Sequence, residues 1–144
     1  MKDQFIGRWK LLSCVAQSGD EKAEPIGANP FGMLFYMPDY MSVFLAKSQR
    51  TNFSVMDMHN VPADEIVSNF PDFEAYCGTY NIDEETKIVA HNIECAKVPN
   101  WIGMDFRRYY QFHDNRLTLT TVDDLSLDNK DWSFVLEWEK VESL

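Results

Sequence analysis

Short segments in which apolar and polar residues alternate recur along most of the chain, and turn-forming residues separate them. This alternation is typical of β-strands that bury one face. It predicts eight strands, at residues 8–17, 32–37, 41–47, 74–82, 87–96, 106–112, 116–122 and 132–141. The Pro38-Asp39-Tyr40 segment, residues 83–86 and the pair Asp114-Asn115 supply turns between neighbouring strands.

Two segments depart from this pattern. Residues 62–70 carry Ile66, Val67 and Phe70 at helical spacing, with Pro62 suited to a first helical position and Pro71 ending the run. They predict one short amphipathic helix. Residues 18–29 are polar and contain glycine and proline, so they predict a long loop.

Eight antiparallel strands in a chain of 144 residues must hide their edges, and full closure does this best. We therefore expect an all-β fold: one domain, residues 1–144, forming a closed eight-stranded up-and-down antiparallel barrel with a short helix. A barrel of this size has room inside for side chains or one small ligand. The alternative fold is a two-sheet sandwich.

Charge and composition restrict the kinds of binding partner and the cellular location that we expect for this protein. A net charge of −10 argues against nucleic acid and against anionic membrane surfaces, because both require a basic face. The chain begins without a signal-peptide pattern and has no apolar run long enough for a membrane helix, so we expect a cytoplasmic protein with reduced thiols. Cys14, Cys77 and Cys95 form no CxxC pair, and we expect Cys77 and Cys95 to be small buried hydrophobes. No oligomeric state follows from the sequence.

Strand alternation also assigns the inward faces. On four strands the inward sets are apolar: Trp9, Leu11, Ser13 and Val15; Met41, Val43 and Leu45; Leu117, Leu119 and Thr121; and Trp132, Phe134, Leu136 and Trp138. On the three strands between them, the faces are Tyr76, Gly78 and Tyr80; Val89, His91, Ile93 and Cys95; and Phe106, Arg108, Tyr110 and Phe112. If these apolar-rich faces point inward, they bring His91 and Arg108 into the barrel. A buried arginine is costly unless a carboxylate, a carbonyl, water or a ligand meets it.

Several motifs resemble those of a known family. Residues 5–11 (FIGRWKL) match the F-x-G-x-W-x-L opening that lipocalins and their calycin relatives share. Further segments resemble the intracellular lipocalin-like domain family of bacteria and fungi: 29–36 with Pro38-Asp39 and 41–43, 76–80, 91–94 followed by 99–103, 108–110 and 116–121. Together these segments span nearly the whole chain.

The resemblance implies a barrel but no particular reaction. Similar small barrels include carriers, and also cofactor-free cyclases and isomerases of natural-product pathways. Asn92 follows His91 where many relatives have a second histidine, which weakens any two-histidine mechanism here.

His91 is the candidate acid or base because histidine titrates near neutrality, although it could equally be an interior histidine satisfied by a tyrosine or a carbonyl. Arg108 could bind an acidic ligand group with its guanidinium fork. Alternatively, Arg108 could close the barrel by pairing with Glu94, Asp105 or the ring face of Trp9.

Three functions remain open. The first is a binding protein for a mostly apolar or aromatic small molecule with an acidic or polar group, lined by Tyr36, Tyr76, Tyr80, His91, Trp101, Arg108, Tyr110, Phe134 and Trp138, and gated by Trp101 and the 62–70 helix. The second is a cofactor-independent cyclase, isomerase or dehydratase, with His91 moving the proton and Arg108 stabilising the oxyanion. The third is a structural alternative, in which the barrel is filled by its own side chains and the function lies on the acidic surface. The sequence contains no spacing typical of a metal site and no cofactor motif, so we expect neither a metal nor a cofactor.

Overall fold

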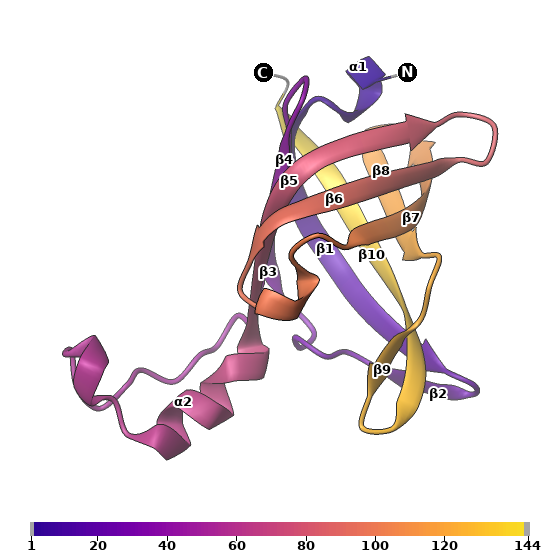
Figure 1. Ribbon diagram of the computed structural model, residues 1–144. Coiled ribbons are helices and arrows are strands. Elements are labelled where there is room, and N and C mark those ends of the chain that lie inside the picture. The colour runs from indigo at the N-terminus through magenta and orange to yellow at the C-terminus, as the bar shows by residue number, and fades with distance from the viewer. Residues whose placement is uncertain (1, 143–144) are drawn as a thin grey trace.

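The chain forms a strongly curved antiparallel sheet with a long excursion at one end (Figure 1). The structure is a computed structural model and describes residues 2–142. Its strands are β1 (Gly7–Ser18), β2 (Glu21–Ala23), β3 (Phe31–Tyr36), β4 (Met41–Ala46), β5 (Phe73–Asp83), β6 (Ile88–Ala96), β7 (Asp105–His113), β8 (Arg116–Thr121), β9 (Leu125–Leu127) and β10 (Lys130–Glu142). The helices are α1 (Lys2–Phe5) and α2 (Ala63–Asn69), and the short 3-10 turns are η1 (Met58–Asn60), η2 (Phe70–Asp72) and η3 (Pro99–Trp101).

Eight of the strands close into a barrel. They pair in the order β1-β3-β4-β5-β6-β7-β8-β10, and β10 pairs back onto β1. The long β1–β10 ladder, from Arg8 opposite Glu142 to Gln17 opposite Ser133, completes the circuit and leaves these strands no free edge. The predicted closed eight-stranded barrel is confirmed.

Two short strands were not predicted. Strand β2 lies within the expected loop 18–29 and pairs with the end of β1, while β9 pairs with the start of β10. The turn between β9 and β10 places Asp128 and Asn129 at φ values of 51° and 62°, the left-handed region that a tight hairpin turn needs. This Asp-Asn pair between alternating residues was the signal for β9. An ion pair of 2.7 Å between Lys130 and Glu21 links the two extensions.

One end of the barrel is closed by Phe5, which follows α1 and is fully buried. Its ring makes edge contacts with Tyr36, Tyr110 and Phe112, with ring centres 4.9–5.1 Å apart. The indole N–H of Trp9 donates to the Phe5 carbonyl at 2.8 Å. The aromatic opening of the sequence therefore seals this end.

The strand ladders contain three register shifts in the described residues, and two of them, both β-bulges, change which of the predicted side chains face inward. In β1 the register shifts between Leu11 and Ser13, so Cys14 and Ala16 are buried in place of the predicted Ser13 and Val15. In β6 the register skips Glu94, because Cys77 pairs with Cys95 and Gly78 pairs with Ile93. Each bulge adds one residue to its strand and reverses the alternation beyond it.

The second bulge corrects the prediction for two cysteines. Cys95 leaves the face of His91 and is exposed on the outside of the barrel, and Cys77 is half-buried beside it. The expectation that both are buried hydrophobes was wrong. Cys14, by contrast, is buried.

The opposite end of the barrel is open to solvent. Along β4 the inward residues pass from Met41, which is 1% exposed, to the half-buried Leu45. Along β10 they pass from Trp138, also 1% exposed, to the half-buried Phe134. Tyr76 on β5 is half-buried as well, whereas Tyr80 is buried. Inward side chains on three strands therefore gain exposure to solvent toward this end.

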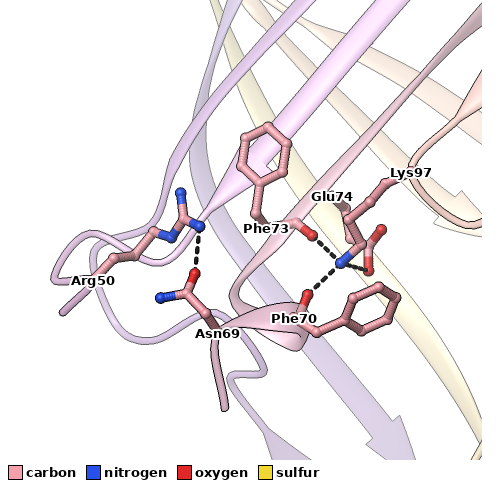
Figure 2. Close-up of polar contacts among 6 residues, drawn as sticks. All are labelled: Arg50, Asn69, Phe70, Phe73, Glu74 and Lys97. Carbon is pink, nitrogen blue, oxygen red and sulfur yellow. Dashed lines mark hydrogen bonds and ion pairs between the residues drawn. The ribbon is translucent and has the colours of Figure 1, made fainter. Parts of the chain in front are cut away.

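Residues 47–72 leave the barrel between β4 and β5 and project away from the open end (Figure 1). Figure 2 shows the base of this excursion. The Lys97 amine donates to the carbonyls of Phe70 and Phe73 and forms an ion pair of 3.2 Å with Glu74. Arg50 donates to the Asn69 side chain. These contacts anchor the excursion where it joins the sheet.

Helix α2 occupies 63–69, within the predicted 62–70, but it does not cover the barrel. The apolar residues Val67 and Ile66 of α2 are 72% and 47% exposed, and Phe70, which follows the helix in η2, is 52% exposed. In Figure 1 the helix lies away from the strands. The predicted gate over the opening is therefore absent from this structure, and only Trp101 of the two expected gating elements lies at the barrel.

Candidate functional site

A histidine held between two tyrosines lies inside the barrel. The hydroxyl of Tyr36 lies 2.6 Å from His91 Nε2, and the hydroxyl of Tyr76 lies 2.7 Å from His91 Nδ1. His91 is 2% exposed and Tyr36 is fully buried, whereas Tyr76 is half-buried. The three side chains form a chain of hydrogen bonds from the closed interior toward the open end.

Three strands place these residues. Tyr36 ends β3, Tyr76 lies on β5 and His91 lies near the middle of β6. His91 pairs with Tyr80 on β5 and with Phe106 on β7, so both of its cross-strand partners are aromatic. Alternation along β6 turns His91 inward with Val89 and Ile93, as predicted from the sequence.

The imidazole of His91 is neutral. Burial, followed by the positive charge of Arg108, lowers its pKa from 6.5 to about 3. A neutral imidazole has one N–H donor and one bare nitrogen acceptor. One tyrosine must therefore donate its hydroxyl proton to His91, and the other must accept the imidazole proton.

The burial of Tyr36 decides between the two arrangements. Among residues 2–142 the Tyr36 hydroxyl hydrogen-bonds only to His91, and a fully buried hydroxyl proton needs an acceptor. Tyr36 therefore donates to Nε2, the imidazole proton lies on Nδ1, and Nδ1–H donates to the Tyr76 oxygen. The Tyr76 hydroxyl proton remains free to point into the half-open part of the barrel.

Arg108 lies on β7 between the inward residues Phe106 and Tyr110. Its guanidinium carbon lies 5.2 Å from the centre of the Phe106 ring, and its NH1 donates to the Arg107 carbonyl at 3.0 Å. The Arg108 charge lowers the pKa of His91 and opposes the increase that burial causes in the pKa of Tyr36 and Tyr76. The Arg108 charge therefore acts on all three groups of the Tyr–His–Tyr hydrogen-bond chain.

In the described part of the chain, Arg108 pairs with none of the three residues suggested as its structural partners. Glu94 accepts a hydrogen bond from Tyr40, and Asp105 accepts one from Asn92. Lys140, not Arg108, covers the ring of Trp9 at 5.1 Å. Within residues 2–142 Arg108 forms no ion pair with a carboxylate, whereas its neighbour Arg107 points outward and pairs with Asp123 at 2.9 Å.

Trp101 lies at the open end of the barrel on η3. It is half-buried and packs edge-on against Tyr76 and Phe106, with ring centres 6.3 Å and 5.1 Å away. Phe106 also contacts Tyr76 at 5.5 Å. The sequence predicted that Phe106 points inward, but Phe106 was not among the predicted site residues. Its position two residues before Arg108, on the same face of the strand, could have indicated that it belongs there.

The other predicted site residues divide into two groups. Phe134 is half-buried at the open end. Tyr80, Tyr110 and Trp138 are buried in the core, and the Tyr80 hydroxyl donates to the Met37 carbonyl at 2.6 Å. The Tyr110 hydroxyl and the Trp138 indole nitrogen are buried without a hydrogen-bond partner in the described residues.

The remaining histidines lie outside the site. His113 is 84% exposed at a hairpin turn, and His59 is exposed in the excursion. Among residues 2–142, no group of three or more histidine, cysteine and carboxylate side chains is arranged to hold a metal ion.

Comparison with known proteins agrees with the barrel. The family described as lipocalin-like domain matches residues 6–141, and the chain therefore belongs to this family. Its barrel is compatible with binding a small molecule. No curated protein and no solved structure matched the chain. In the described residues, no helix is both long enough and apolar enough to cross a membrane.

Proposed function

We propose that this protein binds a small molecule with an apolar or aromatic body and one anionic or oxygen-rich group, inside the open end of the barrel. The observation that carries the proposal is Arg108. This inward-facing cation has no carboxylate partner among residues 2–142, and it lies beside a tyrosine hydroxyl whose proton is free. Arginine binds carboxylates, sulfonates and phenolates through its planar fork of donors.

The apolar part of the ligand is expected against the aromatic residues near this anchor. Trp101, Phe106 and Phe134 supply ring faces and edges at the open end. Such a site combines a mostly apolar wall with a few polar groups that fix orientation, which is the usual composition of a small-molecule pocket. We expect Trp101 to cover the bound molecule.

The alternative, an enzyme that uses His91 as its acid or base, receives less support from the geometry. Both ring nitrogens of His91 are engaged by tyrosines, and its pKa of about 3 is far from the near-neutral value that suits proton transfer. His91 therefore fixes the orientation of Tyr76 for the ligand. We propose a binding protein in which His91 is a positioning residue.

A matched pair of dyes tests this proposal. 1-Anilinonaphthalene-8-sulfonate carries an anionic group, and N-phenyl-1-naphthylamine has the same aromatic body without it. Fluorescence titration of Arg108→Met is expected to show at least a tenfold loss of affinity for the sulfonate, because a hydrogen bond to a charged group contributes about 1.5–3 kcal/mol. Affinity for the neutral dye should change less than twofold.

Arg107→Met is the matched control, since Arg107 is adjacent but points outward to Asp123. It should bind both dyes as the wild type does. Equal losses in the two variants, or wild-type protein that binds neither dye, would contradict the proposal.

A further inference from the structure

Two of the cysteines face each other on the outside of the barrel. Cys77 on β5 and Cys95 on β6 are direct partners in the antiparallel ladder, next to the bulge at Glu94. Direct partners in such a ladder share a face and have Cα atoms roughly 4.5–5.5 Å apart. Disulfides span Cα separations of about 4.4–6.8 Å, a range that includes this ladder spacing.

The surroundings leave both sulfurs reachable. Both cysteines line a shallow, mainly apolar groove over β4, β5 and β6, together with Phe44, Phe73 and Lys97. Cys95 is exposed and Cys77 is half-buried. The Lys97 amine, at the end of this groove, is bound by Glu74 and two backbone carbonyls (Figure 2). The two thiols are therefore the reactive groups of the groove.

A third side chain connects the pair to its surroundings. Tyr40, in the turn between β3 and β4, donates its hydroxyl to Glu94 at 2.9 Å and lies 3.6 Å from the Cys77 sulfur. The hydroxyl has a single proton, which the nearer Glu94 carboxylate accepts, so Tyr40 packs against the Cys77 sulfur without donating to it.

We propose that Cys77 and Cys95 form a reversible cross-strand disulfide when the protein meets a small disulfide oxidant such as oxidised glutathione. The Cys95 thiolate attacks the oxidant, which releases one glutathione thiolate and leaves a mixed disulfide on Cys95. The Cys77 thiolate then attacks the Cys95 sulfur and releases the second glutathione. Two protein thiols are oxidised by two electrons, and one glutathione disulfide is reduced to two thiols, with the two thiol protons passing to glutathione.

The full chain treated with oxidised glutathione tests this directly by intact mass. The wild type is expected to lose about 2 Da, to carry no glutathione and to remain a monomer on a non-reducing gel. Trypsin cleaves after the exposed Lys87, between the two cysteines, so the two fragments should stay joined until a reductant is added. The melting temperature should rise by several degrees, because the bond closes a loop in the unfolded chain.

Single variants distinguish this pair from general thiol reactivity. Cys77→Ser should stop at the mixed disulfide and keep one glutathione on Cys95, and Cys77→Ala provides the same test if the serine variant folds poorly. Cys14→Ser should form the bond as the wild type does, since Cys14 is buried elsewhere. Wild-type protein that retains glutathione on both cysteines, that forms disulfide-linked dimers, or that does not react at all would overturn the proposal.

Discussion

The imidazole of His91 and the hydroxyl of Tyr76 are 2.7 Å apart, and this contact joins the buried half of the barrel to its open half. On the other side of the ring, Tyr36 has no alternative partner in the described residues. The buried Tyr36 therefore determines the direction of both hydrogen bonds in the Tyr36–His91–Tyr76 series. As a result, the Tyr76 hydroxyl proton is left free to donate to a ligand.

Removal of His91 should destabilise the protein strongly. His91→Ala leaves a cavity and two tyrosine hydroxyls without their partner, and we expect the free energy of unfolding to fall by about 3 kcal/mol. Urea denaturation measures this loss. The exposed His113→Ala is the control and should change stability by about 0.5 kcal/mol or less. Equal effects of the two substitutions would show that the tyrosine contacts contribute nothing.

The buried neutral histidine should also make stability depend on pH. The pKa of His91 is about 3 when folded and 6.5 as the reference, so the unfolded chain binds more protons between these values. Stability is then complete above pH 6.5 and falls as the pH drops toward 3, by at most about 1.4 kcal/mol per pH unit from this group.

Urea titrations from pH 7 to pH 4 test this dependence. His91→Gln should show a smaller fall than the wild type, because the glutamine does not titrate. His113→Gln should follow the wild-type curve. Parallel curves for the wild type and His91→Gln would show that His91 takes up its proton in the folded state as readily as in the unfolded state.

Gly78 should not tolerate a side chain. A Cβ at this position would lie 1.8 Å from the Asn92 carbonyl oxygen, across the bulge of β6, and backbone would have to move. Gly78→Ala is expected to cost roughly 2–3 kcal/mol of unfolding free energy. Gly19→Ala, at φ +60° with open space around it, isolates backbone strain and should cost about 1 kcal/mol. A smaller loss at Gly78 than at Gly19 would contradict the close approach.

The closed end of the barrel should contribute more to stability than the excursion. Phe5→Ala removes a fully buried ring with three aromatic contacts, and should cost about 3–5 kcal/mol. Val67→Ala in α2 removes side-chain atoms from an exposed site and should stay within about 0.5 kcal/mol. Chemical denaturation compares them. A large effect at Val67 would contradict its exposed position and would mean that α2 packs against another surface.

Strand alternation was enough to predict the barrel and the inward placement of His91 and Arg108. It could not locate the bulges, since one extra residue in β1 or β6 leaves no mark in the polar and apolar pattern. For that reason Ser13, Val15 and Cys95 were assigned to the wrong face. Because the bulge in β6 could not be located, the sequence also did not predict that Cys77 and Cys95 are cross-strand partners.

The site was harder to predict than the fold. The sequence indicated tyrosines near His91, but which tyrosine meets which nitrogen depends on side-chain reach across strands β3, β5 and β6. The apolar stripe of residues 62–70 predicted a helix correctly and its covering role wrongly, because amphipathicity shows an apolar face without showing what that face packs against.

The protonation state of His91 tests the central claim most directly. Long-range ¹⁵N–¹H correlation spectra of the folded protein, assigned with His91→Gln, report which ring nitrogen carries the proton. We predict a neutral ring at pH 7 with the proton on Nδ1, unchanged down to about pH 4. A proton on Nε2, or an imidazolium at pH 6, would contradict the claim that Tyr36 and His91 together hold the Tyr76 hydroxyl ready for a ligand.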